Sequence, residues 1–110
     1  MGLPKIFITI NPYDFNSKLM CYFAGITDRV DVSFEKLPGF MIRKRAAAND
    51  PVACAKFFYI TINAFLKYLL GFGTEEGIFG EVSAYYGTVE MQGGGTLHFH
   101  CIVWLVEKLP

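Results

Sequence analysis

Two stretches in the last third of the chain have the two-residue period of β-strands. The first, residues 81–92, places one set of alternate side chains on one side, Val82, Ala84, Tyr86, Thr88, Glu90 and Gln92, and a second set on the other, Ser83, Tyr85, Gly87, Val89 and Met91. The second, residues 96–106, reads TLHFHCIVWLV and is rich in β-branched and aromatic residues. Residues 93–95 are three glycines, which can turn the chain through backbone angles closed to other residues. The pattern predicts a β-hairpin.

A helical period precedes this hairpin. In residues 51–70 the apolar side chains of one predicted face recur at three- and four-residue steps, at Cys54, Phe58, Ile62, Phe65 and Leu69. Asp50 can cap the free N–H groups of the first turn, and Pro51 lacks the N–H that would be left unpaired there. Gly71 is a natural stop. We therefore expect one long amphipathic helix, with its stripe in the core.

The rest of the chain adds one strand and two weaker helices. Residues 5–10, KIFITI, suit a strand that stops at Asn11-Pro12. Residues 19–23 fit a short helix, and Pro38-Gly39 marks a turn before another. We predict an α+β fold in a single domain, residues 1–110: an antiparallel sheet of residues 5–10, 81–92 and 96–106, covered by the helix of residues 51–70.

Composition supports a folded domain and gives no sign of a general affinity for nucleic acid. Hydrophobic residues make up 53% of the chain and charged residues 18%, and ten basic side chains balance ten acidic ones. No global positive field would therefore attract nucleic acid. The one dense basic stretch, Arg43, Lys44 and Arg45, is a candidate DNA-binding segment, and a solvated helix face is the plainer interpretation.

The cysteines and the apolar runs suggest a soluble intracellular protein. Cys21, Cys54 and Cys101 are odd in number and form no Cys-x-x-Cys pair, so neither a disulfide framework nor a cysteine zinc site is indicated. The longest apolar run, residues 57–72, is interrupted by Asn63 and Lys67 and falls short of a membrane span. We expect no membrane partner.

The candidate chemistry lies in the predicted hairpin. His98 and His100 are the only histidines, and alternate side chains on a strand project from one face roughly 6–7 Å apart. Glu90 and Gln92 share a face of the preceding strand, and either could supply an oxygen as third ligand. Such a site keeps positions open for water and substrate, which is typical of catalytic metals. The alternative is a hydrogen-bonded polar pair with no metal.

The same residues resemble a known family. The run GIFGEVSAYYGTVEMQGGGTLHFHCIVWL, residues 77–105, is similar to the signature of the Helitron helicase-like N-terminal domain, in which a strand ending Glu-x-Gln leads through a glycine-containing turn to His-hydrophobic-His. LPKIFITINPYD resembles the opening strand of that family, CYFAGI its next segment, and NDPVACAKFFYITINAFLKYLL its long helix. The resemblance covers nearly the whole chain, in order.

This resemblance implies an HUH endonuclease (Rep-like) fold. His98 and His100, with Glu90 or Gln92, would hold a divalent ion, Mg²⁺ or Mn²⁺, that polarises a scissile phosphate of single-stranded DNA. A tyrosine would attack and form a covalent link, which splits strand transfer into cleavage and rejoining. The resemblance further implies a helicase on the same full-length polypeptide and a nuclear location.

Two departures from the family pattern change these expectations. The family places its paired nucleophilic tyrosines on a helix after the histidine strand, whereas all six tyrosines here precede His98. We therefore expect a partial domain without its own nucleophile. Gly94 replaces a basic residue of the turn, and no histidine follows Asn11-Pro12. Two other functions stay open: a non-catalytic single-stranded DNA-binding module or inactive transposon relic, and a metal-dependent phosphodiesterase that uses water.

Overall fold

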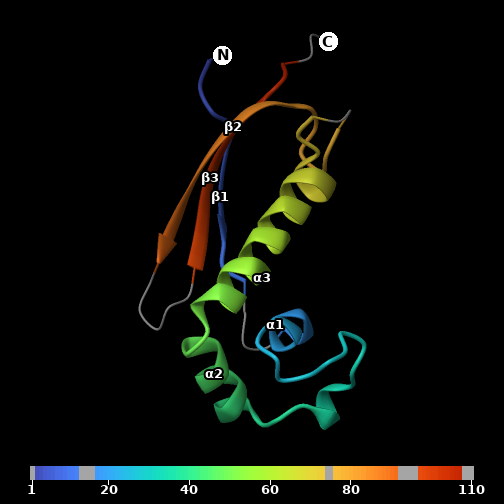
Figure 1. Cartoon of the computed structure of the whole chain (residues 1–110). Helices are drawn as coiled ribbons and strands as arrows, with labels where there is room; N and C mark the ends of the chain where they lie inside the picture. Colours follow the sequence, from blue (N-terminus) through green and yellow to red (C-terminus); the bar gives the residue numbers. More distant parts are fainter. Residues whose placement is uncertain (1, 13–16, 74–75, 92–96, 108–110) are drawn as a thin grey trace.

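The computed structural model describes residues 2–12, 17–73, 76–91 and 97–107, without the side chain of Phe34, and has an α+β fold as predicted (Figure 1). Its elements follow in chain order: β1 (Ile6–Ile10), α1 (Lys18–Phe23), the 3₁₀ turn η2 (Phe34–Lys36), α2 (Phe40–Ala48), α3 (Pro51–Ala64), the π-helical segment η3 (Phe65–Leu70), β2 (Val82–Met91) and β3 (Leu97–Leu105). The predicted strands and helices are all present, with ends shifted by one or two residues.

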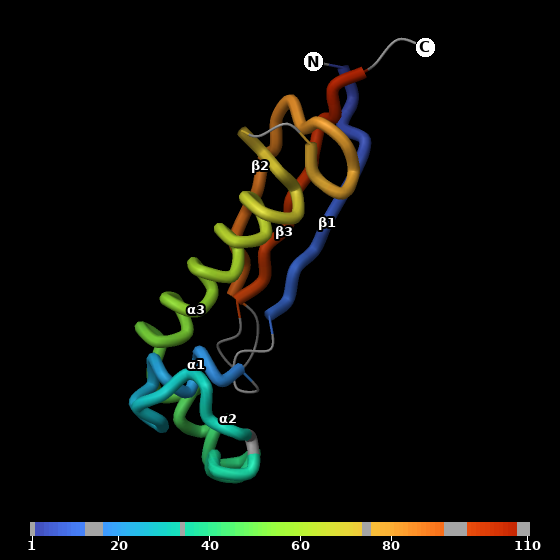
Figure 2. Tube along the Cα trace, turned by 90° about the vertical axis from the view of Figure 1, so that its right-hand side faces the viewer, coloured from blue at the N-terminus to red at the C-terminus, as the bar shows by residue number. Residues whose placement is uncertain are grey.

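The three strands form one antiparallel sheet in the order β1-β3-β2, so β3 is the central strand. Thr9 and Thr88 both lie opposite His100, one on each side of it. Helix α3 runs along one face of this sheet, and α1 and α2 gather beyond its end (Figure 2). The predicted glycine turn at residues 93–95 lies outside the described residues.

A bulge in β2 corrects one predicted face. Val82 pairs with Leu105 and Ala84 with Trp104, so Ser83 is an extra residue, and its hydroxyl donates to the Trp104 carbonyl oxygen at 3.1 Å. The extra residue breaks the two-residue alternation. Val82 therefore belongs to the buried core beside α3 instead of sharing a face with Ala84.

The long helix begins and ends where the sequence predicts, but its last turn is wider than an α-helical turn. Asp50 caps it by accepting a hydrogen bond from the Ala53 N–H at 3.0 Å, and Gly71 ends it in the left-handed conformation. Because η3 is π-helical, its side chains advance by a smaller angle per residue. Leu70 is therefore fully buried and Leu69 is 49% exposed, so the predicted core position Leu69 was wrong.

The Asp50 cap allows a first prediction. Asp50→Ala is expected to lower the free energy of unfolding by about 1 kcal/mol, because the Ala53 N–H loses its acceptor. Urea denaturation of both proteins measures this difference. Asp50→Ser retains a capping oxygen and should behave like the wild type, so an equal loss in both variants would contradict the capping role.

Two hydrophobic clusters meet on α3. Phe58 and Ile62 pack with the sheet residues Phe99, Cys101 and Val103, whereas Phe57 and Cys54 belong to a second cluster with α1 and α2. The molecule is accordingly long, with principal extents of 54 × 29 × 18 Å. Helix α3 therefore packs against both the sheet and the pair of helices α1 and α2.

By length and composition alone, the 20 residues Pro51–Leu70 could cross a membrane, and they are the one such stretch among the described residues. The same test is passed by core helices of soluble proteins, and this helix packs on the sheet. The absence of a membrane partner stays a prediction.

Candidate metal centre on the open face of the sheet

Both histidines lie on the face of β3 that points away from α3. Phe99, Cys101 and Val103 are buried against the helix, so the alternate residues of the same strand must point the other way. His98 and His100 are therefore side by side, with ring centroids 6.5 Å apart and planes 24° apart. This placement agrees with the spacing expected from sequence.

His98 is the deeper of the two histidines. It is only 9% exposed, whereas the side chain of His100 is 26% exposed. Its ring packs beside that of His100, and no buried side-chain nitrogen or oxygen atom among the described residues lacks a hydrogen-bond partner. Imidazole nitrogens are common ligands of divalent ions, so His98 is a candidate ligand by its chemistry and its place beside His100.

His100 contacts polar side chains from both neighbouring strands. Its Nε2 lies 3.1 Å from Oε2 of Glu90 on β2, and its Nδ1 lies 3.2 Å from the hydroxyl oxygen of Thr9 on β1. The tautomer with its proton on Nε2 donates to the Glu90 carboxylate, which only accepts. In a neutral ring Nδ1 then accepts from the Thr9 hydroxyl, and in a charged ring it donates to it.

Of the two predicted oxygen ligands, the structure places only Glu90. It stands directly opposite His98 in the register, on the same open face, and its carboxylate reaches diagonally to His100. Gln92 lies outside the described residues. Glu90 therefore has a carboxylate oxygen close to His100 and lies opposite His98, which makes it the candidate third ligand among the described residues.

Thr9 was missed by the sequence analysis. It is the one polar residue of β1, which was a weak signal, because a strand of this kind often has one solvent-facing side. Its partner became visible only from the pairing of β1 with β3, which joins residues 91 positions apart. A hydroxyl at this place can fix the orientation of the His100 ring.

The predicted DNA-binding segment lies on α2, in the helical end of the molecule (Figure 1). Arg43 donates from Nη1 to the Pro38 carbonyl oxygen at 2.6 Å, so it supports the loop before α2. Lys44 and Arg45 are exposed. Consecutive helical residues point about 100° apart, so the three side chains do not form one flat patch. Their contact with DNA stays a prediction.

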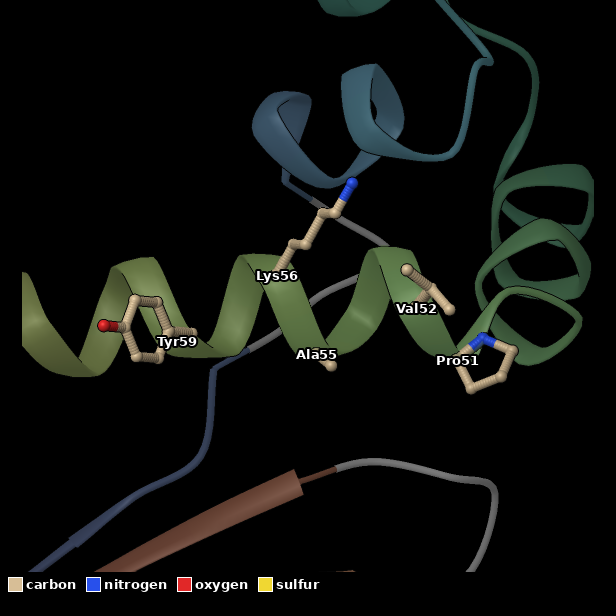
Figure 3. Close-up of a pocket in the computed structure, with 5 residues that line it drawn as sticks. All are labelled: Pro51, Val52, Ala55, Lys56 and Tyr59. Atoms are coloured by element: carbon tan, nitrogen blue, oxygen red, sulfur yellow. The ribbon is translucent and has the colours of Figure 1, made fainter.

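Two aromatic side chains flank the histidines on the open face. Phe7 of β1 and Tyr86 of β2 help to line a hollow of about 200 Å³ that also includes His100 and Ile102. A larger hollow of about 500 Å³ lies along α3, where Val52, Lys56 and Tyr59 are among the lining residues (Figure 3). That second hollow contains one ionisable cation and no set of ligand-type side chains.

All three cysteines are buried, and none of them forms a disulfide bond. Cys101 follows His100 directly, but its side chain packs in the core beside α3. Burial raises the pKa of the Cys101 thiol, because a thiolate would be poorly solvated there. Cys101 thus acts as a small apolar core residue.

A family model matches most of the chain. The family model of the Helitron helicase-like domain at N-terminus matches residues 1–103, which include all three strands almost to their ends and every described helix. No curated protein and no solved structure matches the chain.

Proposed function

This chain belongs to the family of Helitron helicase-like N-terminal domains, and we propose that it is the metal-binding core of a rolling-circle transposase that nicks and transfers single-stranded DNA. Family membership supports a transposon-related function, with a helicase domain on the same longer polypeptide. The nucleophile is assigned to tyrosines of that longer polypeptide, since the family carries them after the histidine strand.

The observation that supports the metal assignment is that His98, His100 and Glu90 lie on one face of two adjacent strands. Two imidazole nitrogens and a carboxylate oxygen form a donor set that suits divalent transition ions such as Mn²⁺. Three protein ligands leave further positions for water and a phosphate oxygen. The described residues contain no group of three or more His, Cys, Asp or Glu side chains already placed to hold an ion, so binding would require these three side chains to move closer together.

When bound, the ion would supply Lewis-acid polarisation of the scissile phosphate. The residues of the chain would hold the ion and orient its ligands. Thr9 holds the His100 ring through Nδ1, and Glu90 approaches Nε2 at 3.1 Å. An ion bound at this nitrogen would replace the contact with Glu90, and the carboxylate could then itself act as a ligand.

The first experiment measures thermal unfolding against MnCl₂ concentration. An ion that binds only the folded protein stabilises it by about 2.7 kcal/mol at a hundred times its Kd. We expect this rise in the wild type and its loss in the double variant His98→Ala, His100→Ala. Magnesium chloride in place of manganese tests the second expected ion.

Thr88→Ala is the matched control, because Thr88 lies opposite His100 on the same face without belonging to the donor set. It should keep the full manganese effect. A folded wild type without any rise in stability would contradict the metal centre, as would an equal rise in the double histidine variant.

A further inference from the structure

We propose that Phe7 and Tyr86 form a stacking platform for the bases of single-stranded DNA beside the candidate metal centre. This inference rests on the proposed function and deepens it, because it assigns the part of the substrate that the open face holds. The platform consists of Phe7, Ile102 and Tyr86, one residue from each strand.

The register places these three residues in one row across the sheet. Phe7 pairs with Ile102, and Ile102 pairs with Tyr86. The row is next to that of Thr9, His100 and Thr88, two residues further along each strand. Two residues of a strand span about 7 Å, so a nucleotide whose base contacts the platform has its backbone within reach of His100.

Both aromatic rings of the platform are largely exposed to solvent. Phe7 is 69% exposed and Tyr86 is 62% exposed, although each belongs to a strand whose other face packs in the core. Phe7 already lies roughly parallel to the His100 ring, with centroids 6.4 Å apart and planes 24° apart. Both aromatic rings and His100 line the same hollow of about 200 Å³.

The charge pattern favours bases over phosphates as the groups that this face recognises. The chain has no net charge, and Lys5, the residue that precedes β1, pairs with Glu107 at 3.7 Å. Attraction of phosphates by basic residues is therefore weak here. Base stacking on aromatic rings needs no net charge and accepts any base sequence.

The test compares two labelled 12-nucleotide probes by fluorescence anisotropy in EDTA: oligothymidylate and an abasic strand of equal length. We expect the wild type to prefer oligothymidylate. Phe7→Leu and Tyr86→Leu should each weaken that binding by roughly 5- to 150-fold and leave the abasic strand unchanged. Tyr86→Phe keeps the ring and should bind like the wild type.

Tyr59→Leu is the matched control, because Tyr59 is also 69% exposed but lies on α3, beyond the other face of the sheet (Figure 3). Equal affinity of the wild type for both probes would overturn the platform, as would an equal loss in Tyr59→Leu. If manganese stabilises the wild type but both probes bind equally well, the stacking platform is wrong and the metal centre stands. If base preference persists without manganese stabilisation, the metal centre alone fails.

Discussion

Phe58→Ala is expected to lower the free energy of unfolding by about 3 to 5 kcal/mol, the largest change among the variants considered. Phe58 is 9% exposed and belongs to the cluster in which α3 packs on Phe99 and Val103. Alanine would leave a cavity at the contact that attaches the helix to the central strand. Urea denaturation with an unchanged m-value measures the loss.

Tyr59→Ala is the natural control, because it removes an aromatic ring from the next position of the same helix. Tyr59 is 69% exposed, so its loss should change the free energy of unfolding by no more than about 0.5 kcal/mol. Similar losses in the two variants would mean that α3 does not pack on the sheet through Phe58.

Gly77→Ala is expected to cost about 3 kcal/mol, for the opposite reason of overpacking. A Cβ atom at Gly77 would overlap the carbonyl group of Leu70 and the carbonyl oxygen of Leu69. These are backbone atoms, so they cannot rotate aside as a side chain would. The Ile78 N–H also donates to the Leu69 carbonyl oxygen at 2.9 Å, which fixes the close approach.

The control for Gly77→Ala is Gly39→Ser. A Cβ at Gly39 meets nothing within 4 Å, and serine is a good residue for the helix cap that Gly39 forms. Gly39→Ser should therefore unfold at a urea concentration near that of the wild type, and Gly77→Ala at a clearly lower one. Equal midpoints would show that the backbone contact of Gly77 with Leu69 and Leu70 can widen to admit a Cβ atom.

Local patterns were enough to predict the elements of this fold, because each strand and helix has its own period and its own stop signal. The errors arose where a single residue changed the period. Ser83 adds a residue to β2 and moves Val82 to the core, and the π-helical turn moves Leu70 into the place expected for Leu69. Both changes are features of the backbone, and the pattern of hydrophobic and polar residues does not reveal them.

The candidate site was predicted only as far as one hairpin extends. His98, His100 and Glu90 share neighbouring strands in sequence, so alternation was enough to group them. The contributions of Thr9 and Phe7 come from β1, whose pairing with β3 joins opposite ends of the chain. The sequence pattern placed residues 5–10 in the sheet but did not identify their neighbouring strand, and only the three-dimensional register shows it.

This domain should tolerate insertions and deletions in some segments but not in the central strand β3. In β3 the core residues Phe99 and Cys101 alternate with His98 and His100, so a one-residue insertion or deletion within the strand would exchange the two sets. Imidazoles would then face the helix, and a phenyl ring would face the ligands. The loop from Gly25 to Ser33 carries no such alternation. We expect related chains to vary in length there and to keep the length of β3 fixed.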